Sequence, residues 1–185
     1  MQVLMGTVTT APCLAVISET EADNMFQISP SASSTDVIVP DNVFQVCFTD
    51  PNQGVSAADY IADNGLATKV AAIYDSSDAY SSGIYNAFAA EAEAKGLEIV
   101  CAEAFTADNK TDFRTQLQKA QSAGADLVFL PIYYQEAALI LTQADQLGYE
   151  PLFFGCDGMD GILTMEGFDA SLADAYPHDP EKAKE

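Results

Sequence analysis

The amino-acid sequence predicts an α/β protein built on a parallel, doubly wound, Rossmann-like sheet. Two observations lead to this fold class. Short apolar runs alternate with stretches of helical length, and Gly96, Gly124 and Gly148 stand where three of those stretches end. Strands that alternate with crossover helices form a parallel sheet with helices on both faces. Ligands of such sheets bind beyond the carboxyl ends of the strands, so we expect the functional residues there.

The first 50 residues contain this pattern in a less complete form. We expect a strand at 3–7, a helix over 10–22, a strand at 25–30 and an extended segment at 42–50. Prolines divide this part of the chain into short pieces. The sequence therefore predicts a small first unit that leads into a longer second one.

From residue 51 onward the alternation is clearer. A helix is expected over about 52–64. The apolar runs that predict buried strands are KVAAIYD (69–75), EIVCAEAF (98–105), ADLVFLPIYY (125–134) and PLFFGCDG (151–158). The helical stripes between them are Ile84 with Phe88, then Phe113, Leu117 and Ala120, then Ile140, Ala144 and Leu147. After Leu172 the pattern gives way to a polar stretch.

Charge excludes several classes of partner. The chain has 28 Asp and Glu against 7 Lys and Arg, a formal net charge of −21, which repels nucleic acid and anionic membrane surfaces. A solvated acidic surface accounts for the same composition. Arg114 is the only arginine, which disfavours a strongly anionic ligand. No apolar run reaches membrane-spanning length, and we interpret the first 15 residues as folded core rather than a signal peptide.

No set of residues predicts catalysis or a cofactor. The single histidine, His178, lies in the polar stretch, so a nucleophile has no well-placed base. The two common glycine-rich nucleotide motifs are absent from the sequence. Four scattered cysteines predict no zinc site, and their spacing leaves both free thiols and disulfides open. We expect a binding protein rather than an enzyme.

Polar residues at the predicted strand ends suit a small zwitterion. Thr10 and Ser33 follow two strands, and hydroxyls beside a helix N-terminus can hold a carboxylate without arginine. Tyr80 and Tyr133 would supply aromatic walls, and Asp157, at the end of the last strand, would pair with an ammonium group. Helix capping accounts for each hydroxyl taken alone, and for Asp157. Core packing accounts for the tyrosines.

The run from Asp112 to Gly158, DFRTQLQKAQSAGADLVFLPIYYQEAALILTQADQLGYEPLFFGCDG, resembles the second lobe of the periplasmic leucine/isoleucine/valine-binding proteins. The pieces GTVTTAPCLAV, ISPSASSTD and FQVCFTDPNQG resemble the preceding lobe and crossover of that family. The resemblance implies a type I periplasmic-binding-protein fold, with two lobes around a cleft that closes on an amino acid. It also implies delivery to the permease of an ABC importer and an extracytoplasmic location, either periplasmic or as a cell-surface lipoprotein.

Site residues follow from the resemblance position by position. The family's ligand-binding positions correspond to Thr10, Ser31, Ala32, Ser33, Tyr80, Tyr133 and Asp157. The first four would hold the carboxylate and part of the ammonium group, and the two tyrosines would contact the ligand from the second lobe. The family usually has glutamate at the acidic position, so the shorter Asp157 changes the distance to the ammonium group.

Compared with the family, the chain corresponds to a second lobe with only part of the first. We expect a partial first lobe at 1–50, on the ligand carboxylate side, a second lobe at 51–172 and a polar tail at 173–185. Exposed apolar edges would then favour a homodimer. The alternative to a solute-binding protein is a truncated chain that cannot bind ligand and folds as a domain-exchanged dimer.

Overall fold

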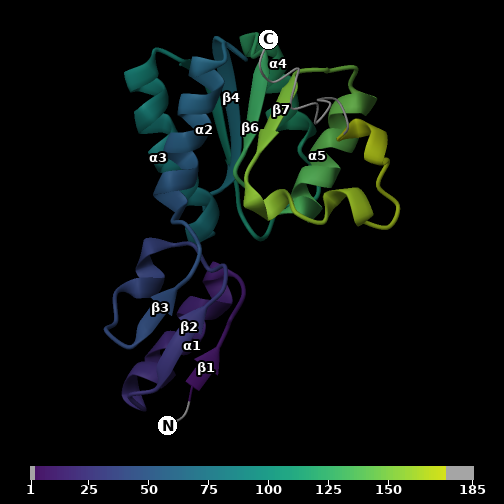
Figure 1. Cartoon of the computed structure of the whole chain (residues 1–185). Coiled ribbons are helices and arrows are strands. Elements are labelled where there is room, and N and C mark those ends of the chain that lie inside the picture. Colours follow the sequence, from purple (N-terminus) through teal and green to yellow (C-terminus); the bar gives the residue numbers. More distant parts are fainter. Residues whose placement is uncertain (1–2, 174–185) are drawn as a thin grey trace.

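The computed structural model describes residues 3–173, which form two parallel sheets (Figure 1). The strands are β1 (Val3–Met5), β2 (Phe26–Ser29), β3 (Val43–Gln45), β4 (Lys69–Asp75), β5 (Glu98–Phe105), β6 (Leu127–Leu130) and β7 (Leu152–Gly155). The helices are α1 (Thr10–Ala22), α2 (Asp50–Asp63), α3 (Ala79–Lys95), α4 (Arg114–Ala123) and α5 (Tyr134–Gln146), with 3-10 turns η1 (Thr35–Ile38), η2 (Asp157–Met159), η3 (Ile162–Thr164) and η4 (Ala170–Leu172). The predicted α/β fold is confirmed.

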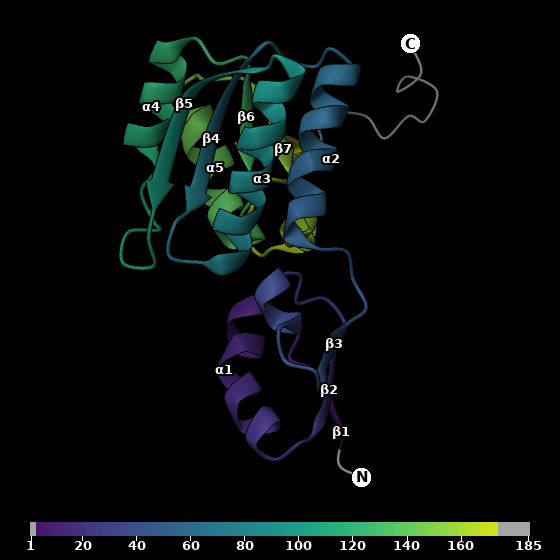
Figure 2. The ribbon, with the colours of Figure 1, turned by 90° about the vertical axis from the view of Figure 1, so that its left-hand side faces the viewer.

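The large sheet has the strand order β5-β4-β6-β7 and is covered on both faces. Because successive side chains of a strand point to opposite faces, Val70 and Ala72 of β4 pack in the core under α2 and α3, while Ala71 and Ile73 pack under α4 and α5. Figure 2 shows α2 and α3 side by side over one face. This half of the chain is therefore doubly wound, as the sequence predicts.

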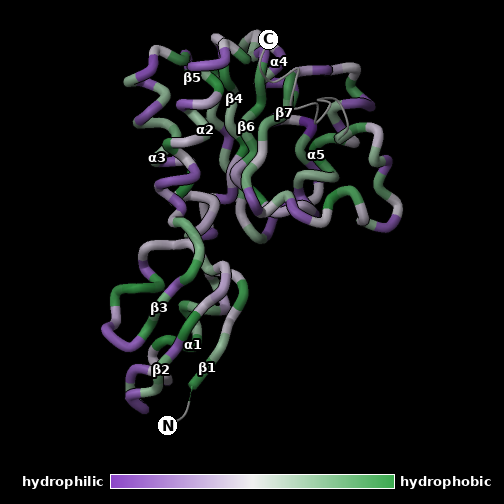
Figure 3. The backbone as a smooth tube through the Cα atoms, in the orientation of Figure 1, coloured by the Kyte–Doolittle hydropathy of each residue, from purple (hydrophilic) through white to green (hydrophobic). Residues whose placement is uncertain are grey.

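The small sheet has the order β1-β2-β3, and α1 covers only one of its faces. Cys13 and Val43 are buried between α1 and the sheet. On the opposite face Phe26 and Phe44 stack with their ring centroids 5.1 Å apart, and Met5 is 82% exposed. The apolar stretches of β1 and β3 are visible in Figure 3. The sheet thus presents an apolar face to its surroundings, which we call the open face.

Residues 46–49 link β3 to α2, and within residues 3–173 the chain passes between the two sheets only there. Helix α2 begins at Asp50, two residues earlier than the sequence predicts. Pro51 lies in the first turn, where its missing N–H is not needed, so it starts the helix rather than delaying it. The crossover is consequently short and is followed at once by a helix.

Two predicted strands are shorter than their apolar runs. β6 ends at Leu130, before Pro131, so Tyr133 is the N-cap of α5 and the prediction that it ends a strand is wrong. β7 ends at Gly155, and Asp157 opens the turn η2 instead of ending that strand. Both residues nevertheless lie just beyond the carboxyl end of a strand.

Other sequence expectations concern caps, cysteines and the terminal region. Gly96 and Gly124 cap α3 and α4 with φ of 75° and 73°, which confirms two of the predicted helix ends. All four cysteines, each within the described part, are free thiols. His178 lies outside the described residues. No helix within 3–173 combines the length and apolar character needed to cross a membrane.

Candidate functional site

A cavity of about 350 Å³ lies between the two sheet units, at the carboxyl ends of their strands. Its walls are formed on the small-sheet side by Val8, Thr9, Thr10, Ser31 and Ser33, and on the large-sheet side by Tyr80, Tyr133, Tyr134, Asp157, Gly158 and Asp160. We call this cavity the cleft. Six of the seven predicted site residues line it. The exception is Ala32, which is fully buried in the core beneath α1.

The small-sheet wall offers hydroxyls of two kinds. Thr10 Oγ1 accepts a hydrogen bond from the Ser34 N–H at 3.4 Å, so its own proton remains free to be donated. The Ser31 hydroxyl donates to the Val8 carbonyl oxygen at 2.7 Å, which leaves only its lone pairs for a ligand. Thr10 is also the first residue of α1, where the helix dipole favours negative charge. This wall can bind a ligand carboxylate at Thr10 and a hydrogen-bond donor of the ligand at Ser31.

The large-sheet wall is organised by a tyrosine. The Tyr80 hydroxyl donates to Asp157 Oδ1 at 2.6 Å and accepts the Gly158 N–H at 2.9 Å. Its ring stacks on Tyr133 with centroids 4.8 Å apart. Burial and the neighbouring Asp157 raise the pKa of Tyr80 far above its usual value, so the hydroxyl stays protonated. Tyr80 therefore fixes the Asp157 carboxylate and supports the Tyr133 ring, in addition to lining the cleft.

A second contact, from helix α2 of the same unit, holds the Asp157 backbone. The Asp157 N–H donates to Gln53 Oε1 at 3.2 Å, and Gln53 lies in the first turns of α2. Gly158 follows, and a Cβ there would lie 2.7 Å from the Tyr80 hydroxyl oxygen and 2.8 Å from the Ile132 carbonyl oxygen. Only glycine fits this approach, so the turn after β7 is closely fitted around Asp157.

Several cleft residues were missed by the sequence reasoning. Tyr134 and Asp160 line the cleft one and three residues beyond predicted site residues, and adjacency was the only available signal. Gln53 gave no signal, because its role depends on a contact with a residue 104 positions away. Sequence patterns show periodicity within one segment, but they do not show which residues far apart in the sequence are in contact.

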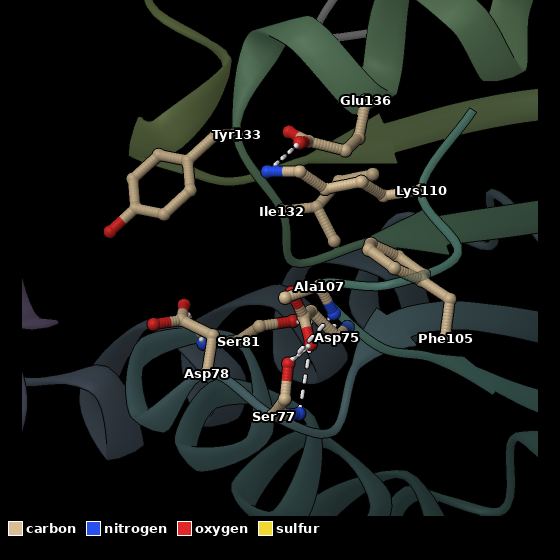
Figure 4. A pocket seen from close by; sticks show the side chains of 10 residues that line it. All are labelled: Asp75, Ser77, Asp78, Ser81, Phe105, Ala107, Lys110, Ile132, Tyr133 and Glu136. Atoms are coloured by element: carbon tan, nitrogen blue, oxygen red, sulfur yellow. Dashed lines mark hydrogen bonds and ion pairs between the residues drawn. The ribbon is translucent and has the colours of Figure 1, made fainter.

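A second cavity of about 250 Å³ adjoins the cleft at the ends of β4, β5 and β6 and shares Tyr133 with it (Figure 4). Lys110 Nζ lies 3.1 Å from Glu136 Oε1 on one side of this cavity. Asp78 lies on the opposite side, and burial, together with the charges of Asp75 and Glu136, raises its pKa. Within residues 3–173 no cluster of His, Cys, Asp and Glu is arranged to hold a metal ion.

We compared the sequence with models of known protein families. The family model described as "Periplasmic binding protein" matches residues 1–176. The chain belongs to this periplasmic binding protein family. The membership confirms the predicted resemblance.

Individual relatives of this periplasmic binding protein are amino-acid binders by name. Leu/Ile/Val-binding protein homolog 3 of Brucella melitensis is 31% identical over 158 residues, covering 84% of this chain and 42% of that protein. The leucine-, isoleucine-, valine-, threonine-, and alanine-binding protein of Pseudomonas aeruginosa is 28% identical over 170 residues, covering 87% and 45%. The chain therefore spans somewhat under half the length of these relatives.

Solved structures agree with the fold. A leucine binding protein from Thermotoga maritima superposes with a TM-score of 0.83 at 29% identity, covering 90% of this chain and 48% of that one. The branched-chain amino acid transporter substrate binding protein of Streptococcus pneumoniae, in complex with isoleucine, has a TM-score of 0.77 at 30% identity, covering 84% and 44%. The family and these neighbours are substrate-binding transport proteins and not enzymes.

Proposed function

We propose that this chain provides the ligand cleft of a solute-binding protein of an ABC importer, and that it captures an amino acid or a similar zwitterion. The observation that carries the proposal is the division of the cleft, with hydroxyls and a helix N-terminus on one wall and Asp157 on the other. Opposite walls of opposite chemistry suit a ligand that carries a carboxylate at one end and an ammonium group at the other.

The carboxylate would lie against the small-sheet wall. Thr10 has a free hydroxyl proton, Ser33 adds a second hydroxyl, and the first turn of α1 contributes the positive end of its dipole. Among residues 3–173, no lysine or arginine lines the cleft. Neutral donors would therefore hold the carboxylate.

The ammonium group would lie between Asp157 and Ser31. Asp157 is exposed to the cleft and held in place by Tyr80, and the Ser31 oxygen retains lone pairs that accept a hydrogen bond. The Tyr133 ring forms the adjoining wall and would pack against apolar parts of the ligand.

In the same proposal residues 1–50 are part of a first lobe, residues 51–172 a second lobe and residues 173–185 a tail. The full protein would act outside the cytoplasm and deliver its ligand to an ABC permease. The names of the relatives and the family membership support this role. Because the chain spans under half the length of those relatives, we propose these partners and this location for the whole protein.

Calorimetric titration tests the cleft. L-Leucine, L-isoleucine and L-valine should bind, and Asp157→Asn should weaken L-leucine by at least about tenfold, since a charge-assisted contact contributes more than about 1.4 kcal/mol. Isocaproate, which is leucine without its ammonium group, should bind weakly and equally to both proteins. Asp145→Asn, at an exposed carboxylate in the last turn of α5, is the matched control and should change nothing. An unchanged L-leucine affinity in Asp157→Asn would remove the proposed site.

The open face of the small sheet favours a second candidate, in which two copies of this chain associate and ligand binding is lost. Parallel sheets are normally covered on both faces, yet the stacked pair of Phe26 and Phe44 has no cover within residues 3–173. Light scattering on a sizing column would give a dimer, and Phe44→Glu would give a monomer. A wild-type monomer that binds L-leucine contradicts this candidate.

A further inference from the structure

Asp50 is a buried carboxyl group without a partner at the junction of the two sheet units. It is the first residue of α2 and directly follows the crossover at 46–49. The residue is 1% exposed, and neither Oδ1 nor Oδ2 has a hydrogen-bond partner. Buried polar groups are almost always paired, and an unpaired buried charge is costly. The site proposed above makes no use of this group.

The surroundings of Asp50 connect it to the cleft. Its backbone N–H donates to the Ser33 carbonyl oxygen at 2.9 Å, and Ser33 lines the cleft. On the other side, a Cβ placed on Gly83 of α3 would lie 3.4 Å from both Cβ and Oδ2 of Asp50. The carboxyl group is thus enclosed between the Ser33 loop of the small unit and the first turns of α3.

The charged groups that face Asp50 are all acidic. They lie on or beside three elements, with Asp157 in η2, Asp78 at the N-cap of α3 and Asp36 in η1. Burial is the main cause that raises the Asp50 pKa to about 7, these three charges add to it, and the nearby Ser33 hydroxyl opposes it. Asp50 therefore gains or loses its proton near neutral pH.

Two thiols and one phenol near this junction stay neutral in the same range. Burial raises the pKa of Cys47 above its usual value, that of Cys156 to about 12, and that of Tyr133 above its usual value. Their thiol and phenol groups keep their protons where Asp50 titrates. These three groups therefore do not contribute to a change of charge at the junction near neutral pH.

We propose that Asp50 is a positioning residue of the cleft, whose proton decides which way the Ser33 hydroxyl points. When Asp50 is protonated, its carboxyl O–H donates to Ser33 Oγ, and the Ser33 O–H is free to donate to a carboxylate in the cleft. When Asp50 releases the proton to solvent, its carboxylate accepts the Ser33 O–H. The cleft then loses one donor and gains a nearby negative charge. This proposal rests on the proposed function and deepens it, because it links capture of a carboxylate to one proton.

The consequence is a pH-dependent affinity. Since the bound state favours protonated Asp50, affinity is highest below about pH 7 and falls as the pH rises through that value, by up to about tenfold per pH unit. In Asp50→Asn the amide N–H donates permanently to Ser33 Oγ, as the protonated carboxyl does. That variant should bind with a nearly constant affinity.

The experiment is calorimetric titration of L-leucine, L-isoleucine and L-valine at about pH 6, 7 and 8. Each probe remains a zwitterion throughout, so a pH dependence belongs to the protein. We expect the wild-type dissociation constant to rise at least about threefold from pH 6 to 8, and that of Asp50→Asn to change less than about twofold. His178 is present in both proteins and cannot produce the difference. Parallel pH profiles of the two proteins would overturn the role of Asp50.

Two further measurements keep the outcomes distinct. Ser33→Ala should bind more weakly and show a smaller pH dependence, because only the charge of Asp50 then acts on the cleft, and this tests the proposal if Asp50→Asn does not fold. Carbon-13 NMR of aspartate-labelled protein, without any ligand, should show one carboxyl that titrates near neutral pH, vanishes in Asp50→Asn and shifts upward in Ser33→Ala. Titration of Asp50 below about pH 5 overturns the inference whatever binds. If none of the three amino acids binds at any pH, the proposed function fails, and the cleft role of Asp50 fails with it.

Discussion

Replacing Gly54 with alanine should destabilise the protein, although it adds the best helix former to the interior of α2. A Cβ at this position would lie 2.4 Å from the Ile84 carbonyl oxygen, 2.7 Å from the Phe88 nitrogen and 2.9 Å from Ala87 Cβ. These atoms belong to α3, mostly to its backbone, so α2 and α3 must move apart. Alanine gains about 1 kcal/mol in helix propensity, while overpacking costs about 1 to 3 kcal/mol. We expect the upper part of that cost, because the whole helix pair shifts, and a net loss of about 2 kcal/mol.

Thermal unfolding followed by circular dichroism measures this loss. For a chain of this size about 2 kcal/mol corresponds to a Tm lower by about 4 to 8 °C. Gly83→Ala is the matched control, since Gly83 lies in α3 facing α2 and its added Cβ would make only ordinary contacts with Asp50 at 3.4 Å. That control should keep or raise the Tm. A Gly54→Ala protein that melts at or above the wild-type temperature would refute the steric reasoning.

Three further outcomes test other contacts. Tyr80→Phe leaves the Gly158 N–H without its acceptor and should lower the free energy of unfolding, measured in urea, by about 1 to 3 kcal/mol. An unchanged urea midpoint would contradict this expected loss. Gln143→Leu should cost a similar amount, because the buried Gln143 Oε1 accepts the Phe113 N–H at 2.7 Å, and full stability in that variant would argue against the contact. The folded-state pKa of Asp50 lies above its unfolded value, so its contribution is present at acidic pH and lost as the pH rises through about 7. Asp50→Asn should accordingly become more stable relative to wild type between pH 5 and 8, by at most about 3 kcal/mol, and a constant difference would contradict the assignment.

Much of the fold follows from local pattern. The helix predicted over 10–22 and the strands at 69–75 and 98–105 have the bounds found in the structure, because their apolar spacing, glycines and prolines act within each segment. The runs at 125–134 and 151–158 were overextended. Apolar residues continue past these strand ends, with Ile132 after Pro131 and Cys156 after Gly155, while the backbone has already left the sheet.

The cleft was predictable to the extent that strand ends meet at one edge. Thr10, Ser33 and Asp157 follow strands, and the family resemblance assigned them together. What could not be predicted depends on pairs of distant residues. The hydrogen bond between Tyr80 and Asp157 spans 77 positions, and the burial of Asp50 arises from two units that enclose it. Neither leaves a periodic trace in the sequence.

The passage at 46–49 has a mechanical consequence. A single covalent connection permits torsion about its own axis as well as bending, so among the described residues the alignment of the two walls depends on weak contacts, such as the hydrogen bond from the Asp50 N–H to the Ser33 carbonyl oxygen. Twisting would slide Thr10 sideways past Asp157 without widening the cleft. The distance between the carboxylate-binding and ammonium-binding ends of the cleft would then vary with the torsion angle. A zwitterion that contacts both ends would stabilise only the angle at which this distance matches its own length.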